Sequence, residues 1–224
     1  MIGLNSKYVV VPLVFPVDNA GTVTSDIISL SRYNQAEIYI MTAAAFTKTS
    51  AVTLTQGVSV SSAATALAFG KYYETGMMLK YDAPSTGVAA AAGEMATGAG
   101  GGICTVFEDR GGVIVGYNWN STAFVDNELL TFSGGKTATV DGIRYNEDVM
   151  IPRVATANTF AITQVLDINK TFMIPVNSSM LTGGMDCIRL NMGDCDSPSL
   201  LAAFAILSEP RYAGTPGETA IYNV

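Results

Sequence analysis

The chain has 224 residues, of which only 14% are charged and none is histidine, and its net charge is −7. A chain of this length can bury a core without disulfides or metal ions, and its composition excludes a disordered protein. Its twelve basic residues are scattered singly, which argues against direct binding of nucleic acid, since that requires a basic surface.

Strand patterns recur along the whole chain. In residues 36–42 (AEIYIMT), the apolar Ile38 and Ile40 alternate with Glu37, Tyr39 and Met41, which would face away from the core. Residues 50–56 (SAVTLTQ) alternate in the same way, and this period of two is typical of a strand with one face in water. Helical patterns are weak throughout. The sequence therefore predicts an all-β fold, an antiparallel β-sandwich of jelly-roll-like type. Further strands are predicted at 9–15, 113–119, 129–132, 137–140, 160–166, 172–176, 187–192 and 200–207.

Neither of the two longest apolar stretches is a membrane span. Residues 8–17 and 200–207 are far shorter than the roughly 20 residues that a spanning helix needs. Pro12 and Pro16 also interrupt the first stretch, which spoils a signal-peptide core. We expect a protein with no membrane partner that is made in the cytoplasm.

The Ala/Gly-rich segment 84–102 predicts a flexible surface loop. It ends in the run 98–102, in which four of the five residues are glycine. Glycine clusters favour a mobile loop over a stable packed element.

Catalytic motifs are missing from the sequence. The absence of histidine excludes Ser-His-Asp and Cys-His nucleophilic catalysis. Residues 133–139 contain GKT, but the glycine that a phosphate-binding loop needs before it is replaced by Leu130, so we predict a hairpin turn with Lys136 in solvent. We expect no enzyme, no catalytic residue and no cofactor.

The cysteines and the acidic pairs predict structural roles. Cys104, Cys187 and Cys195 are an odd number, and we expect free thiols, buried or half-buried, rather than disulfides or a metal site. Asp194 and Asp196 could share a calcium ion, but turn capping is the favoured interpretation.

The aromatic patch at 117–120 (YNWN) leaves a binding function open. Trp119 is expected to be an ordinary strand residue, and the alternative is a ring that stacks on a sugar. An exposed aromatic platform around Tyr117 and Trp119 would indicate a carbohydrate-binding, adhesin-like module.

The end of the chain predicts a structural latch. An apolar strand at 200–207 runs into SEPRYAGTP, and Pro210 cannot donate a ladder hydrogen bond, so we expect the chain to leave the sheet there. Arg211 would bond carboxylates or free carbonyls, and Tyr212 would pack its ring against the sandwich. Pro210, Arg211 and Tyr212 would then aim the last residues toward a neighbouring subunit.

Several segments together resemble a family of tailed-bacteriophage head proteins. The resemblance rests on SAVTLTQG at 50–57, ALAFGKYY at 66–73, TFAITQVLD at 159–167, GGMDCIR at 183–189 and PRYA at 210–213. It implies a core sandwich at 1–76 and 144–224, with an insertion of projecting β-loops at 77–143.

The resemblance also implies a function in the virion. Relatives in this family are similar to β-sandwich cement or decoration proteins, so we expect a capsid protein on the exterior of the head. Its partners would be the major capsid protein and further copies of itself. The copies would form a homo-oligomer, which we expect to be a trimer. A tail or collar component and the carbohydrate-binding module are the alternatives.

Overall fold

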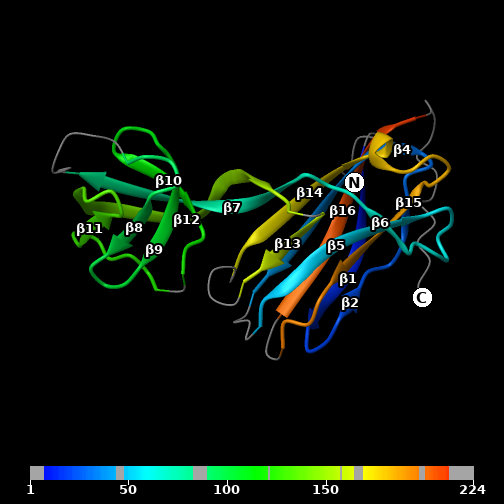
Figure 1. The fold of residues 1–224 in the computed structure, drawn as a ribbon, viewed down its shortest axis with the longest axis horizontal. Helices are drawn as coiled ribbons and strands as arrows, with labels where there is room; N and C mark the ends of the chain where they lie inside the picture. The colour runs from blue at the N-terminus through cyan, green and yellow to red at the C-terminus, as the bar shows by residue number, and fades with distance from the viewer. Residues whose placement is uncertain are drawn as a thin grey trace, which may run out of the picture. The chain divides into compact units, whose positions relative to one another are not determined.

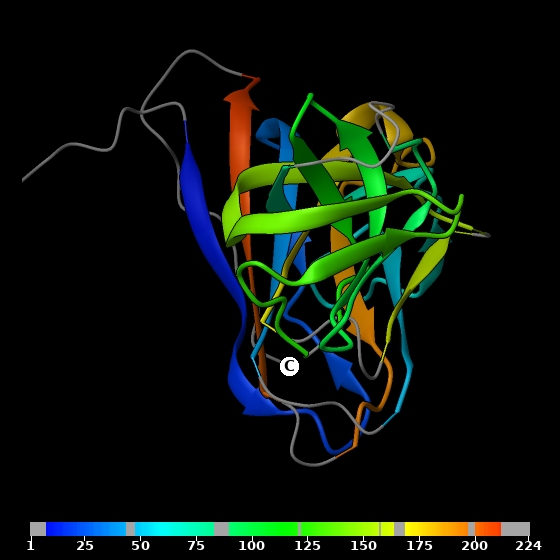
Figure 2. The ribbon, with the colours of Figure 1, turned by 90° about the vertical axis from the view of Figure 1, so that its left-hand side faces the viewer.

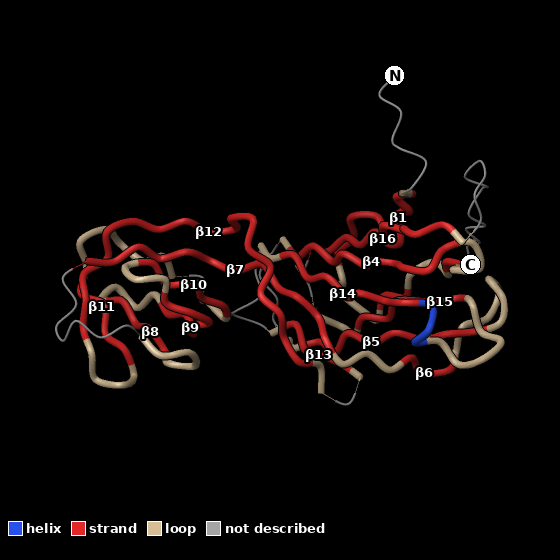
Figure 3. Tube along the Cα trace, turned by 90° about the horizontal axis from the view of Figure 1, so that it is seen from above, coloured by secondary structure: helices blue, strands red, loops and turns tan. Residues whose placement is uncertain are grey.

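The computed structural model describes residues 8–43, 48–82, 90–120, 122–156, 158–163, 169–196 and 200–211. Almost every element among them is a strand, which confirms the all-β prediction, and η1 (Ser178–Met180) is a single helical turn (Figure 3). No helix in these ranges is long and apolar enough to cross a membrane. The strands are β1 (Val9–Asp18), β2 (Val23–Thr24), β3 (Ile28–Ser29), β4 (Tyr33–Thr42), β5 (Ser50–Gly57), β6 (Thr65–Leu67), β7 (Lys71–Asp82), β8 (Met95–Gly98), β9 (Ile103–Asp109), β10 (Val113–Tyr117), β11 (Leu129–Phe132), β12 (Thr137–Val154), β13 (Thr159–Ile162), β14 (Thr171–Asn177), β15 (Cys187–Met192) and β16 (Leu200–Pro210).

The chain forms two compact units (Figure 1). The first comprises the described residues within Met1–Tyr73, Arg153–Gln164 and Thr171–Val224. The second comprises those within Glu74–Pro152 and Val165–Lys170, and it extends beyond the expected insertion at both ends.

The first unit is a jelly roll. One sheet has the order β1-β16-β4-β14 and the other has the order β13-β5-β15-β2, and neighbouring strands within both are antiparallel. β3 also pairs with β15, so β2 and β3 together fill one strand position. Numbered along the chain, the eight positions run 1-8-3-6 in one sheet and 5-4-7-2 in the other. This is the double-sheet jelly-roll arrangement, so the predicted sandwich class is confirmed.

The core of the jelly roll follows from the alternation of the strands. Ile38 and Ile40 on β4, and Leu54 on β5, point between the sheets and are at most 1% exposed. An aromatic cluster joins the two sheets: Phe160 on β13 stacks on Tyr72 at 4.1 Å between ring centroids and lies 5.4 Å from Phe172 on β14. Such contacts contribute roughly 0.5–1.5 kcal/mol each beyond their buried area.

The second unit is a closed barrel. Its strands pair in the order β7-β10-β9-β8-β11-β12, and β12 pairs back to β7, so this sheet has no free edge. The interior is filled by side chains that alternate along the strands, including Leu79, Val106, Ile114, Leu130 and Val140.

Close packing in the barrel explains one of its glycines. A Cβ at Gly116 on β10 would lie 3.0 Å from the sulfur of Cys104 on β9. A side chain there would press on Cys104, so glycine suits the close packing at this position.

The predicted flexible loop at 84–102 is wrong in its described part, whereas 84–89 lie outside the described residues. Residues 95–98 form β8, and Ala96 is fully buried in the barrel core. The glycines that suggested mobility make a tight turn instead: the amide of Gly98 donates to the carbonyl of Gly102 at 2.8 Å, and Gly101 has φ +91°. Small side chains fit the barrel interior, and glycines close the turn to β9.

Candidate interaction surface

The outer face of the β1-β16-β4-β14 sheet is unusually apolar. The registers place outward side chains in rows across the strands, whereas an antiparallel sheet with one wet face normally carries polar residues there. One row is Val10, Ile206, Glu37 and Pro175, the next is Pro12, Phe204, Tyr39 and Met173, and a third holds Ala202, Met41 and Thr171.

Several of these side chains are exposed. Val10 is 54% exposed and Met41 42%, and Leu200 at the start of β16 is 46% exposed. Contiguous apolar surface of this kind marks contact sites with other proteins. We call this face the apolar outer face.

A stacked pair forms its centre. The rings of Tyr39 and Phe204 lie 5.0 Å apart with an interplanar angle of 9°. The Tyr39 hydroxyl donates to Glu37 Oε2 at 2.9 Å, and partial burial, together with this carboxylate, raises the pKa of Tyr39 to about 12. The phenol therefore stays neutral and holds the Glu37 carboxylate at the border of the apolar rows.

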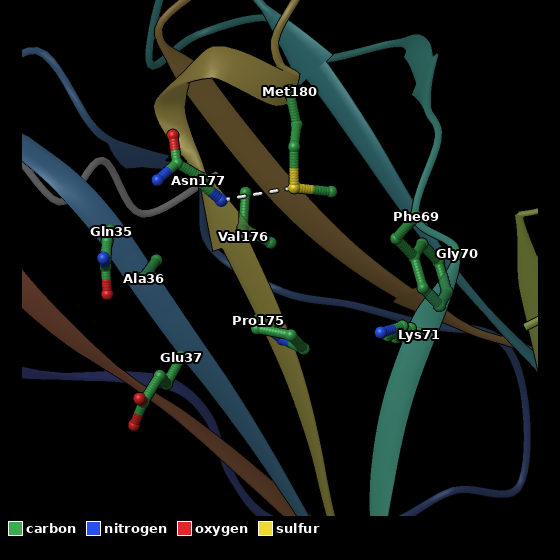
Figure 4. A pocket seen from close by; sticks show the side chains of 10 residues that line it. All are labelled: Gln35, Ala36, Glu37, Phe69, Gly70, Lys71, Pro175, Val176, Asn177 and Met180. Carbon is green, nitrogen blue, oxygen red and sulfur yellow. Dashed lines mark hydrogen bonds between the residues drawn. The ribbon is translucent and has the colours of Figure 1, made fainter. Parts of the chain in front are cut away.

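The sheet is hollowed beside this border. A hollow of about 360 Å³ lies between β4, β14 and the segment that leads into β7 (Figure 4). Its apolar floor includes Phe69, Pro175 and Met180, and the Met180 sulfur accepts a hydrogen bond from the amide of Asn177 at 3.3 Å. The lining residues are Gln35, Ala36, Glu37, Phe69, Gly70, Lys71, Pro175, Val176, Asn177 and Met180.

The hollow combines an apolar floor with a charged rim. Glu37 contributes a carboxylate from β4, and the exposed Lys71 contributes an ammonium group from the start of β7. An apolar group can enter such a hollow while the two charges orient what surrounds it, which is the usual composition of a specific binding pocket.

The edge of this sheet is formed by β1, which runs beside β16 (Figure 2). Phe15 on β1 is 74% exposed, and the register shifts on both sides of Val14. Pro12 and Pro16 lie in the same strand, and proline on an edge strand hinders pairing with a further strand. An approaching partner therefore meets side chains rather than a free backbone ladder.

The structure places two of the three predicted latch residues. β16 continues to Pro210, which pairs with Tyr33, so the strand is three residues longer than predicted. The amide of Arg211 donates to the carbonyl of Arg32 at 2.9 Å, and its Nε donates to the carbonyl of Tyr33 at 3.3 Å. Tyr212 lies outside the described residues.

The residue before Pro210 has an unusual backbone conformation. Glu209 has φ +54°, in the left-handed region, although the register continues unbroken from Ser208 opposite Gln35 to Pro210 opposite Tyr33. The sequence showed the proline, but it gave no signal for this conformation.

The cysteines are free and buried, as predicted. Burial raises the pKa of Cys104 to about 12, and burial together with Asp186 does the same for Cys187. Burial also raises the pKa of Cys195. These groups are held as thiols rather than as nucleophilic thiolates.

The acidic pair caps a turn and binds a lysine. Asp194 accepts a hydrogen bond from the amide of Asp196 at 2.8 Å, and Lys48 Nζ lies 3.1 Å from Asp194 and 3.0 Å from Asp196. The amide of Asp196 and the ammonium of Lys48 lower the pKa of Asp194. Across the described ranges, no group of three or more His, Cys, Asp or Glu side chains is placed to hold a metal ion.

Two other predicted positions lie in the barrel unit. The hairpin predicted around GKT is present between β11 and β12, but Lys136 is largely covered, with its side chain 22% exposed and 3.5 Å from Glu94. Trp119 is only 8% exposed, and the ammonium of the buried Lys170 lies 4.1 Å from the centre of its ring. The ring therefore forms no open platform for a sugar.

Sequence reasoning missed the apolar outer face and its hollow. The alternation of 36–42 correctly placed Glu37, Tyr39 and Met41 on the side away from the core. That Tyr39 and Met41 lie beside Phe204 and Ala202 follows only from a register between segments far apart in the chain.

Comparisons with known proteins assign no family. No protein-family model matches the chain, and no curated protein matches it. A chain in the structure of the infectious bursal disease virus Gx strain is similar over 91% of this chain and 80% of that chain, with 6% identity and a TM-score of 0.23. A likeness this weak assigns neither a family nor a function.

Proposed function

We propose that the protein is a structural component of a bacteriophage virion, specifically a non-enzymatic cement or decoration protein on the exterior of the capsid. The observation that carries the proposal is the apolar outer face on a jelly-roll unit. Jelly rolls serve in viral capsids as well as in lectins, so the fold is compatible with the proposal without deciding it. The resemblance of the terminal segments to phage head proteins is the reason for proposing a role in the virion.

The apolar outer face is the surface that would bind the major capsid protein. Cement proteins act through many symmetric copies, so contacts of modest strength sum to a large avidity. Apolar side chains such as Met41, set beside the stacked Tyr39 and Phe204, suit the water-excluding centre of such a contact.

Mass spectrometry of purified virions tests the proposal by copy number. Decoration of the head requires on the order of hundreds of copies per particle, because each repeats with the shell. A number near roughly six or twelve would instead indicate a ring in the tail or collar, as expected of cyclic assemblies, and would refute decoration. Absence from the particles would refute a virion role.

Re-addition of purified protein to heads that lack it tests the surface. The wild-type chain should bind these heads and raise the temperature at which they rupture. Met41→Asp should abolish both effects, because it places a charge in the apolar outer face. Val154→Asp is the matched control, since Val154 is also exposed, at 79%, but lies outside that face.

A further inference from the structure

We propose that copies of this chain assemble head to tail, with Phe15 of one copy inserted into the hollow of the next. This deepens the proposed function, on which it rests, by naming the surface through which the copies contact each other. Phe15 and the residues that line the hollow belong to the same unit.

Phe15 has the properties of an inserted group. It is the aromatic residue of β1, with 74% of its surface accessible, and Val17, two residues further along, is 38% exposed. Buried aromatic side chains that fill a partner's pocket serve as anchors in protein–protein interfaces. Left in water, it forgoes the favourable burial of its ring.

The hollow has the size and floor to receive it. An apolar cavity of about 150 Å³ accommodates a benzene ring, and this hollow measures about 360 Å³. Phe69, Pro175 and Met180 supply an apolar surface against which a ring can pack. The extra volume leaves room for a neighbour such as Val17.

The two halves carry a pair of charges of opposite sign. Lys71 stands on the rim of the hollow together with Glu37, and Asp18 is an exposed carboxylate three residues after Phe15. The proposed contact pairs Asp18 of one copy with Lys71 of the next. The proline-bearing edge of β1 disfavours the competing contact, in which two copies would pair their backbones.

The arrangement of the two halves determines the kind of assembly. Phe15 lies on β1 at one edge of the sheet, whereas β4 and β14 frame the hollow beyond β16. A contact between two different patches is heterologous, and it closes into a ring when the rotation permits. Two copies related by a two-fold axis would exchange the contact reciprocally, and three or more copies would form a ring.

Sedimentation velocity of the isolated full-length chain tests the proposal with two variants. The wild type should form a small closed ring. Phe15→Asp removes the inserted group, and Gly70→Trp fills the hollow, because a side chain at Gly70 meets nothing within 4 Å. Each should weaken association at least about thirtyfold, the effect of losing a hot spot.

Matched controls exclude general effects of these substitutions. Val58→Asp changes another highly exposed apolar side chain, and Gly183→Trp adds the same bulk at another glycine with open space around it. Both should assemble like the wild type, and thermal melting should show that all four variants fold.

A mixing experiment distinguishes a heterologous contact from a symmetric one. The Phe15→Asp chain keeps its hollow and the Gly70→Trp chain keeps its Phe15, so the two together should form a one-to-one dimer that neither forms alone. Should Gly70→Trp fail to fold, Lys71→Glu replaces it: this variant should weaken association at least tenfold, and Asp18→Lys in the same chain should restore it.

Three results would overturn the proposal: a wild-type chain that is monomeric at all concentrations, variants that assemble unchanged, or folded variants that fail to complement each other. The last would indicate a symmetric contact. A chain that forms rings but is absent from virions would refute the virion function and leave this contact standing. A monomer present in virions at high copy number would refute this contact and leave the virion function standing.

Discussion

At the scale of single residues, Asp109 organises one end of the barrel. Its carboxylate accepts hydrogen bonds from the Tyr81 hydroxyl at 2.5 Å, the Ala90 amide at 2.7 Å and the Gly111 amide at 2.9 Å. Burial and this carboxylate raise the pKa of Tyr81 from 10.0 to about 12. The neutral phenol is thus the form that the folded barrel prefers.

Replacing Tyr81 by phenylalanine tests this arrangement. Removing the hydroxyl should lower the free energy of unfolding by about 1 kcal/mol at neutral pH. Because folding raises the pKa, the phenol's contribution is complete below pH 10 and is lost as the pH rises through about 12. Between pH 10 and about 12, the free energy of unfolding measured in urea should therefore fall less for Tyr81→Phe than for the wild type. Tyr8→Phe, at a position 51% exposed, should behave like the wild type.

Glu209 carries a conformational cost that glycine would relieve. Its φ of +54° disfavours a residue with a Cβ, and its side chain is exposed. Glu209→Gly should raise the free energy of unfolding by about 0.5–1 kcal/mol. The control Ser208→Gly, at a position regularly paired with Gln35, should lower it. If both variants are destabilised alike in urea unfolding, the backbone at Glu209 is not strained.

At the scale of elements, the sequence predicted strands where a period of two was strong. The segments at 36–42, 50–56 and 187–192 fall within β4, β5 and β15, because each must bury one face in the core. β8 was missed because its four residues, Met-Ala-Thr-Gly, are mostly small and lie in a glycine-rich setting. Their role depends on barrel strands that cover them, which local propensity cannot show.

The candidate surface was less accessible to sequence reasoning than the strands. Pro210 and Arg211 were singled out from a short motif, whereas Phe15 passed as part of an apolar strand. The hollow combines residues near 35, 70 and 176, and this combination exists only once the sheet order is known.

A single charge should show that β8 is a core element. Ala96→Asp places a carboxylate at a position with no exposure, so it should lower the free energy of unfolding by about 3 kcal/mol or more. Ala92→Asp, in an exposed part of the same segment, should change it by less than about 0.5 kcal/mol. Equal, small effects in chemical denaturation would mean that the segment is a surface loop after all.

At the scale of the whole molecule, each unit has its own apolar core. The jelly roll is built around one set of buried side chains and the barrel around another. Units with separate cores can unfold separately, so a single midpoint need not describe the protein.

Scanning calorimetry should therefore resolve two transitions in the full chain. Ala96→Asp should lower one of them, and Ile188→Ala, at a fully buried position of the jelly roll, should lower the other. A single transition that both variants shift equally would show that the units unfold as one.

The closure of the barrel by β7 and β12 has a consequence for how such a protein diversifies. The two strands pair, and a Cβ at Gly76 would lie 2.7 Å from the side chain of Ile151, so the entrance and the exit of the insertion are immediate neighbours. The insertion therefore leaves and re-enters the jelly roll at two adjacent points, as a short hairpin would. Its length adds little entropic cost to closing the connection. Such a junction is a natural grafting point: the barrel could be exchanged for a short turn or for a foreign domain while the eight-position scaffold keeps its own pairing.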